Sequence, residues 1–310
     1  MKGYRIDKIN ASNVRHIAQL HYKVYGERLS TEFFRKKYNT IYTGKSPIGY
    51  IAYTVEGKPV AAFAFLPCFI KYENRLLLAG QAADAMTLRE HQKKGLFVEM
   101  VNRIMNDCNE QGVDLLFGFP NQFSYEIMMQ KFGWKETERL LNFTISVRAS
   151  MSAALLKRLP VLKGLYAVYK EKVLAQYTLL LNGVDNSVIR EGYAGIDRSG
   201  EYFDYKGYTG SIVVKAGEGR VWLKVKDAAY IGDIERRGED IETIVSVLKE
   251  LAGKLGIKAI YFQASGSVGL AKAFAELYEG VPAFNMIYKV LRGDIDADKI
   301  KFTFADADVF

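Results

Sequence analysis

The spacing of apolar residues in the first half of the chain alternates between the periods of strands and helices. An apolar run over residues 76–87 predicts a strand. Apolar positions three or four residues apart over 97–109 predict a helix with one buried face. Gly112 supplies a usual helix stop. The short apolar run 113–119, which ends before Pro120, predicts a buried strand.

Further elements flank this strand–helix–strand segment. Asn121 and Ser124 are candidate N-caps of a second helix that ends at Gly133. A loosely alternating run over 140–147 predicts a last strand. Upstream, the turn residues 56–59 lie between two apolar runs, which is a hairpin signal. The predicted order is helices, three antiparallel strands, a glycine turn, helix, strand, helix and strand.

The second half of the chain repeats this order of elements. The predicted elements are three strands over 211–214, 221–225 and 228–234, a helix over 241–255, a strand over 257–263, a helix over 268–278 and a strand over 284–291. The glycines keep similar spacing: Gly95 to Gly112 is 17 positions, and Gly238 to Gly256 is 18. We therefore expect two units of similar plan.

These units set the expected domain boundaries. Residues 1–148 form the first domain, 149–178 a helical linker and 179–310 the second domain. The linker contains two predicted helices, over 151–159 and 161–174. Amphipathic helices of this kind either lie on a membrane or pack between domains, and we favour packing between the domains.

The loop between the first predicted strand and helix is a candidate anion site. A glycine turn at a helix start presents several backbone N–H groups to one point, and the helix dipole adds to their attraction for a phosphate. Gly95 allows a close approach of the backbone, and Lys93 and Lys94 add positive charge. A basic helix start can equally be a solvated turn.

Together, these motifs resemble the GNAT superfamily of acyl-CoA-dependent N-acyltransferases. The family's phosphate loop reads Gln/Arg-x-x-Gly-x-Gly/Ala; here Gln92 and Gly95 match, and Phe97 departs at the last position. The segment 118–121, with Ser124 and the pair Gly133-Trp134, is similar to a later motif of the family. The resemblance covers residues 1–147 and implies an α+β fold. Each of the two units would then have a mixed, mostly antiparallel twisted sheet flanked by helices.

The resemblance also implies a binding mode for acetyl-CoA as co-substrate. Backbone groups of Gln92, Lys93, Lys94, Gly95, Leu96 and Phe97 would hold the pyrophosphate. Met86 and Thr87 would face the thioester, and Asn121 and Ser124 would lie on the coenzyme side. Tyr22, Tyr25 and Phe34 are candidates for the wall of an acceptor site.

The catalytic groups are less clearly marked. Asp84 lies on the strand before the phosphate loop and is a candidate general base. One alternative is that Asp84 is a structural residue at a bulge and bonds to its own backbone or to an arginine. Another is that a chain of water molecules accepts the proton. The family places a tyrosine acid about where Met128 and Met129 stand here. Tyr125, one helical turn earlier, is the candidate that this chain offers.

The second unit lacks the features of a phosphate loop. Glu239 and Asp240 follow Gly238, where they would repel a phosphate, although acidic residues also favour a helix N-terminus for structural reasons. We interpret this unit as a degenerate copy, forming a structural or acceptor-binding wall.

Composition adds a few limits. The chain has 310 residues, of which 49% are hydrophobic, and a net charge of +8, which suits anionic ligands such as coenzyme A. Its basic residues are dispersed, which disfavours nucleic-acid binding. The two cysteines and three histidines do not form a metal pattern. The chain shows neither a signal peptide nor a transmembrane run, so a cytoplasmic location is expected.

The leading hypothesis is acetyl transfer from acetyl-CoA to an amine by direct attack in a ternary complex. A non-catalytic acyl-CoA or metabolite sensor and an aminoacyl-tRNA-dependent transferase are the alternatives. The acceptor, the acyl chain length and the oligomeric state are left open.

Overall fold

A computed structural model describes residues 3–310, which divide into two compact units. The first unit contains the chain up to Thr137 together with Asn285–Lys299. The second unit contains Glu138–Phe284 and Ile300–Phe310. Both units mix helices with a largely antiparallel sheet, as expected for the α+β class.

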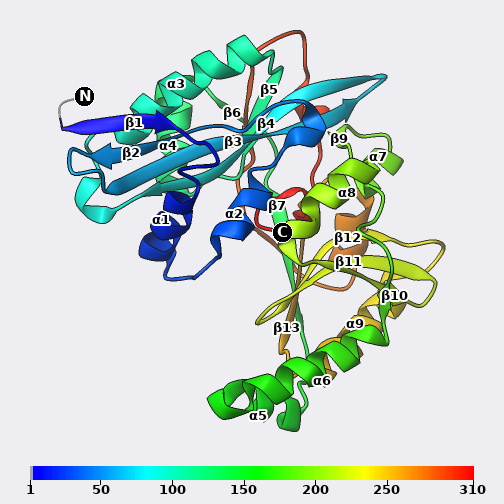
Figure 1. Ribbon diagram of the computed structural model, residues 1–310. Helices are drawn as coiled ribbons and strands as arrows, with labels where there is room; N and C mark the ends of the chain where they lie inside the picture. Colours follow the sequence, from blue (N-terminus) through cyan, green and yellow to red (C-terminus); the bar gives the residue numbers. More distant parts are fainter. Residues whose placement is uncertain (1–2) are drawn as a thin grey trace. The chain divides into compact units, whose positions relative to one another are not determined.

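The first unit is built on one long mixed sheet. Its elements are β1 (Tyr4–Lys8), α1 (Arg15–Tyr25), α2 (Thr31–Lys37), η1 (Ile41–Thr43), β2 (Ile48–Thr54), β3 (Pro59–Tyr72), β4 (Arg75–Thr87), η2 (Arg89–His91), α3 (Leu96–Gln111), β5 (Leu115–Gly118), α4 (Gln122–Phe132), β6 (Lys135–Glu136), β15 (Ile287–Val290) and η5 (Ala297–Lys299). The strands follow the order β1-β2-β3-β4-β5-β15-β6, and the β4–β5 pair is parallel. Helix α3 lies on one face of this sheet, and α1 and α2 lie on the other (Figure 1).

The second unit has a seven-stranded sheet of the same plan. Its elements are β7 (Leu140–Ser146), α5 (Met151–Arg158), η3 (Pro160–Leu162), α6 (Lys163–Ala175), β8 (Thr178–Leu179), α7 (Ser187–Arg190), β9 (Gly195–Ile196), α8 (Gly200–Lys206), η4 (Gly207–Thr209), β10 (Ile212–Ala216), β11 (Gly219–Val225), β12 (Ala229–Glu235), α9 (Ile241–Lys254), β13 (Ala259–Ser265), α10 (Gly269–Ala275), β14 (Gly280–Pro282) and η6 (Phe304–Asp306). The order is β8-β10-β11-β12-β13-β7-β14, and here β12 and β13 form the parallel pair.

Two strands pair in a different sheet from the one expected from the sequence, which corrects our sequence-based placement. The strand expected to end the first unit, β7, pairs along its whole length with β13. The strand expected to end the second unit, β15, pairs with β5 and β6. Each sheet is therefore completed by a strand from the other half of the chain.

Apolar residues of the predicted stripes form the two cores. In the first unit, Ile104 and Cys108 of α3 are fully buried against β2 and β3. Burial raises the pKa of the Cys108 thiol to about 12, which suits a core residue rather than a nucleophile. In the second unit, Ile244 and Leu248 of α9 have the corresponding role.

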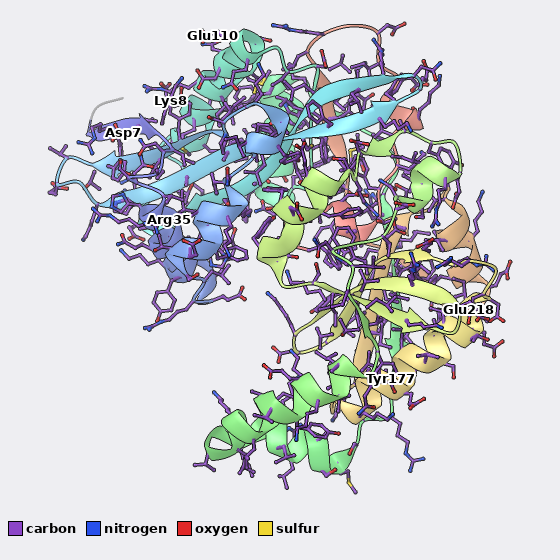
Figure 2. The ribbon with its side chains drawn as sticks, turned by 45° about the vertical axis from the view of Figure 1, so that its right-hand side comes forward. Asp7, Lys8, Arg35, Glu110, Tyr177 and Glu218 are labelled. Carbon is purple, nitrogen blue, oxygen red and sulfur yellow. The ribbon has the colours of Figure 1, made fainter. Side chains whose placement is uncertain are left out.

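A buried carboxylate fastens α3 to the edge of the first sheet. Asp107 of α3 accepts hydrogen bonds from Lys8 Nζ at 2.9 Å and from the Tyr50 hydroxyl at 2.8 Å. Figure 2 labels Lys8 on β1 and Glu110 at the end of α3. This lysine–aspartate–tyrosine group is structural, and it provides a matched control for a similar group described below.

The expected linker helices belong to the second unit. The hydroxyls of Tyr166 and Tyr169 on α6 donate to the carbonyls of Leu255 and Lys254 at the end of α9. Tyr177, labelled in Figure 2, continues this contact by donating to Glu250. Apolar side chains that remain exposed on α5, η3 and α6 are Met151, Leu155, Val161, Leu165 and Val168. No helix among the described residues is both long and apolar enough to span a bilayer.

One lysine of the second unit should give a pH-dependent stability. Burial lowers the pKa of Lys206 to about 7, and the charged groups that act on it are Asp308, Lys224, Asp306 and Arg198. Between pH 7 and the usual lysine pKa, the unfolded chain holds a proton that the native state has released. Stability should therefore rise with pH in this range, by up to about 1.4 kcal/mol per pH unit, and show no such slope below pH 7.

Urea unfolding at pH 6, 7, 8 and 9 measures this slope. We expect Lys206→Met to abolish the part of the slope above pH 7, whereas Lys215→Met, at a lysine that is 55% exposed, should keep it. Equal slopes for the wild type and Lys206→Met would contradict the assignment.

Candidate functional site

The N-terminus of α3 has the geometry of an anion site. The backbone adopts left-handed conformations at Lys93, with φ 59°, and at Gly95, with φ 78°. Gly95 is the N-cap residue and provides no side chain to cap the helix. The first N–H groups of a helix have no acceptor within the helix. Here they face the exposed segment 92–95.

Apolar contacts fix the start of this helix. Leu96 is 1% exposed, and the ring of Phe97 packs against Phe63 with 4.9 Å between ring centroids. Phe97 stands where the GNAT phosphate loop carries a small residue. Its side chain turns into the core, so the departure from the motif leaves the backbone of the loop unobstructed.

The polar side chains of the loop remain in solvent. Gln92, Lys93 and Lys94 are exposed, and Gln92 Nε2 donates to the carbonyl of Thr87 at 3.4 Å. The lysines can therefore reach an anion bound at the helix start. The adjacent His91 is engaged with the Tyr4 hydroxyl at 2.8 Å.

The strand that leads to this loop has a free stretch and a bulge. Pairing between β4 and β5 extends from Ala79 to Gln81 on β4, and β4 then continues to Thr87. On its other side, the β3 register shifts between Ala62 and Ala64, and Asp84 takes a left-handed φ of 52°. A bulge bends the strand and redirects its backbone groups. The structure thus places a bulge on β4 beyond the end of the β4–β5 pairing.

Asp84 lies at this bulge in a buried polar group. Its carboxylate accepts hydrogen bonds from Lys37 Nζ and the Tyr38 hydroxyl, both at 2.9 Å. The side chains of Lys37 and Asp84 are only 4% and 8% exposed. Both carboxylate oxygens are therefore already engaged within the unit, and removing one partner of a buried ion pair is costly. A structural Asp at a bulge is one of the alternatives considered from the sequence. Its charged partner is a lysine, Lys37, and not the arginine considered there.

Met86 and Thr87 differ in what they expose. Met86 is 2% exposed and its side chain belongs to the core, so only its backbone can meet a ligand. Thr87 is half-buried at the end of β4. Among the acceptor candidates, Phe34 is fully buried, which is incompatible with lining a pocket in this structure. Tyr25 is 55% exposed, with its hydroxyl 3.5 Å from the carbonyl of Ala85 on the bulge.

Asn121 and Ser124 form the N-cap of α4, as their sequence position indicated. The Asn121 side chain accepts from the Ser124 amide at 3.0 Å, and the Ser124 hydroxyl donates back to Asn121. Asn121 is exposed and Ser124 is half-buried. They retain polar atoms at the helix start while performing this structural role.

Tyr125 is held by an acidic neighbour. Its hydroxyl donates to Glu136 Oε2 on β6 at 2.5 Å. Met128, by contrast, is 2% exposed and packs in the core. The hydrogen bond to Glu136 therefore fixes the orientation of the Tyr125 hydroxyl. The position at which the family has a tyrosine is occupied by an apolar residue in this chain.

Sequence reasoning missed the partners Lys37, Tyr38 and Glu136. One local signal existed for the first of them. Lys37 follows the buried Phe34 by three residues, so both lie on the same face of α2 and the lysine is directed toward the core. The pairing with Asp84 spans 47 positions and has no local signal.

The second unit fills its own counterpart of the anion site. Arg237 and Gly238 have positive φ, as Lys93 and Gly95 do. The N-cap of α9, however, is Asp240, whose carboxylate accepts from the Thr243 amide at 2.6 Å. The carboxylate of Glu239 accepts from the Glu218 amide at 3.0 Å. Carboxylates of the chain therefore occupy the region where a phosphate would bind. Among the described residues, no group of His, Cys, Asp and Glu side chains could hold a metal ion.

Comparisons with known proteins agree with the motifs of the first unit. Residues 5–137 match the family model described as an acetyltransferase (GNAT) domain. No curated protein is significantly similar to the chain in sequence.

Several solved structures share the fold over nearly the whole chain. A Pyrococcus horikoshii protein, described provisionally as an acetyltransferase, is 12% identical with a TM-score of 0.58, covering 99% of this chain and 95% of its own. An Enterococcus faecalis V583 protein, described as a probable N-acyltransferase, is 13% identical with a TM-score of 0.57, covering 93% and 73%. A GCN5-related N-acetyltransferase from Sphaerobacter thermophilus is 11% identical with a TM-score of 0.51, covering 96% and 98%.

At these identities the solved structures establish the fold, and the family model adds the sequence motifs of residues 5–137. That fold supports acyl transfer as a general reaction class. Residues 5–137 therefore match the acetyltransferase (GNAT) family model, and the chain as a whole shares the fold of these solved structures.

Proposed function

We propose that the first unit binds an acyl-CoA, in the simplest case acetyl-CoA, and transfers its acyl group to an amine. The observation that carries this proposal is the uncapped N-terminus of α3 behind Gly95, which follows the part of β4 that extends beyond its pairing with β5. The pyrophosphate would bind the backbone N–H groups at 92–97, with Lys93 and Lys94 nearby. Backbone groups of β4 from Ala82 to Thr87 would accompany the pantetheine arm.

In the proposed reaction, the amine nitrogen attacks the thioester carbonyl in a ternary complex. A C–N bond forms and the C–S bond breaks; the amine loses a proton to a base or water, and the thiolate of CoA gains one. In this proposal, the backbone of the bulge at Asp84 would lie beside the path of the thioester. Because the Asp84 carboxylate is already paired with Lys37, its proposed role is to position the proton acceptor for the amine.

Tyr125 is the proposed acid that protonates the leaving thiolate. If so, Tyr125→Phe should lower kcat by about 10²-fold and leave acetyl-CoA affinity nearly constant, since the phenyl ring keeps the packing. CoA release in the presence of a panel of amines measures both quantities. Tyr42→Phe is a matched control, because the Tyr42 hydroxyl donates to a carbonyl, Pro67, elsewhere in the same unit. An unchanged kcat for Tyr125→Phe would remove Tyr125 from the mechanism.

The experiment that tests the proposed function is a thermal-shift series with acetyl-CoA, longer acyl-CoAs and free CoA. A ligand that binds only the native state raises the melting temperature according to its affinity. We expect acetyl-CoA and CoA to stabilise the protein. The absence of any shift with all of these ligands at millimolar concentration would contradict acyl-CoA binding. Stabilisation without CoA release for any amine would favour the alternative, a sensor of acyl-CoA.

A further inference from the structure

The second unit also has a strand that extends beyond its parallel partner, as β4 does in the first unit. β12 pairs with β13 in parallel from Ala229 to Ile231, and β12 then continues to Glu235. The β11–β12 register shifts between Trp222 and Leu223, opposite Gly232. This is the arrangement of β4 and β5 in the first unit, where we place the pantetheine arm. In the second unit, residues 300–310 of the same chain lie in the corresponding place.

The segment Ile300–Phe310, which we call the tail, pairs with the end of β13. Thr303 forms an antiparallel bridge with Ala264, and the Ser265 amide donates to the Phe302 carbonyl at 2.9 Å. The Phe302 amide donates in turn to the Ser265 hydroxyl at 3.1 Å. Strand β7 already pairs with β13 from Ala259 to Ser265 along its other edge. The tail therefore lies along the edge of β13 that faces β12.

The last residue of the tail is an apolar anchor. Phe310 is fully buried, and its ring packs edge-on against Trp222 and Phe304, each with 5.5 Å between ring centroids. A Cβ atom on Gly232 would lie only 2.2 Å from this ring. Gly232 on β12 thus leaves the space that the terminal aromatic ring occupies.

Polar side chains of the second unit bind the backbone of the tail. Lys206 Nζ donates to the Ala307 carbonyl at 2.8 Å, the Tyr208 hydroxyl to that of Asp308 at 3.0 Å, and Lys224 Nζ to that of Val309 at 2.7 Å. These three contacts are made to consecutive backbone carbonyls. Recognition of backbone carbonyls is typical of a groove that holds an extended peptide.

A buried charge cluster fixes the middle of the tail to β12. Arg198 is 1% exposed and donates to Asp306 of the tail at 2.8 Å and to Asp233 of β12 at 2.5 Å. It also donates to the Thr303 hydroxyl at 2.9 Å. Removing the tail would leave the Arg198 and Asp233 charges without this partner in an apolar setting, which is costly.

We propose that the groove between β12 and β13 is a peptide-binding site and that its resident ligand is the tail of the same chain. The tail takes the place that the pantetheine arm has in our account of the first unit, and it closes the second unit to acyl-CoA. The aromatic ring of Phe310 and three backbone carbonyls are the recognised features. The groove therefore takes an extended peptide that carries a buried aromatic residue.

The test uses the full chain with Phe310→Ala, which weakens the anchor and leaves the rest of the tail in place. Hydrogen exchange of residues 300–307 should accelerate by at least about tenfold in this variant. Val309→Ala is the matched control within the tail, because Val309 is 60% exposed, and it should exchange like the wild type. Lys224→Met provides a second weakened chain that retains the aromatic anchor.

A synthetic peptide of residues 300–310 distinguishes a binding site from ordinary packing. The peptide should bind Phe310→Ala, whose groove keeps all of its donors, in a fluorescence titration and should not bind the wild type, whose groove is occupied. It should bind Lys224→Met more weakly than Phe310→Ala, because that variant lacks one donor of the groove. The peptide carrying Phe310→Ala should bind at least about tenfold more weakly than the unmodified peptide, and the one carrying Val309→Ala should bind as well as it.

Two results would overturn the proposal. The first is fast tail exchange in both weakened chains without any binding of the unmodified peptide. The second is calorimetric binding of two acetyl-CoA molecules per wild-type chain. We expect fewer than two acetyl-CoA molecules per chain, whether or not the first unit proves to be an acyltransferase. The test of the tail therefore does not depend on the proposed function.

Discussion

Replacing Gly95 by glutamate should abolish detectable binding of acetyl-CoA. The substitution places a side chain at a left-handed backbone position, φ 78°, and a negative charge at the point where the pyrophosphate would meet the helix N-terminus. Strain and like-charge repulsion act in the same direction, and we expect a loss of affinity of about 10²-fold or more. Isothermal calorimetry of the full chain measures it.

The chain offers a close control at the other end of the same helix. Gly112 caps the C-terminus of α3 with φ 79°, so Gly112→Glu introduces the same strain and charge away from the proposed site. It should lower stability and keep acetyl-CoA affinity within about twofold. Gly95→Ala, which adds strain without charge, should give an intermediate loss. Equal affinities for Gly95→Glu and the wild type would place the coenzyme elsewhere.

Asp84→Asn should lower kcat by about 10²-fold with little change in acetyl-CoA affinity. The amide keeps the shape of the side chain but removes the charge that faces Lys37 at the bulge. CoA release with a panel of amines measures the rate, and calorimetry measures the affinity. A lower kcat at constant affinity would indicate a role in the reaction, because a general loss of structure would reduce both kcat and affinity.

The matched control for Asp84 is Asp107. Both carboxylates are buried, and both accept one hydrogen bond from a lysine and one from a tyrosine. Because Lys8 is 63% exposed and Lys37 only 4%, Asp107→Asn should cost less stability than Asp84→Asn, and it should leave kcat unchanged. If Asp84→Asn reduces kcat no more than Asp107→Asn does, the bulge group is structural only. If Lys37→Met lowers kcat as Asp84→Asn does, the ion pair acts as one positioning unit.

Local pattern was sufficient to predict most elements and to indicate a candidate anion site. The apolar stripe over 97–109 and the glycines that flank it are properties of neighbouring residues, and the structure has α3 over Leu96–Gln111 between Gly95 and Gly112. The phosphate-loop candidate was found in the same way, because backbone geometry at a glycine depends on a few residues only.

Features that depend on distant residues were not predictable. The strands β7 and β15 both mix apolar and polar residues, and neither sequence indicates the sheet in which the strand pairs. The partners of Asp84 come from α2, and the role of the tail depends on Gly232 and Lys206, which precede it by many positions. Such contacts are set by the tertiary fold.

The central claim is that one coenzyme site lies at the N-terminus of α3 in the first unit. A crystal structure of the full chain with CoA tests this most directly. The account predicts pyrophosphate density against the backbone amides of residues 92–97, with the pantetheine arm beside β4 and the tail still in place between β12 and β13. CoA bound in the second unit with the tail displaced, or bound away from Gly95, would contradict it.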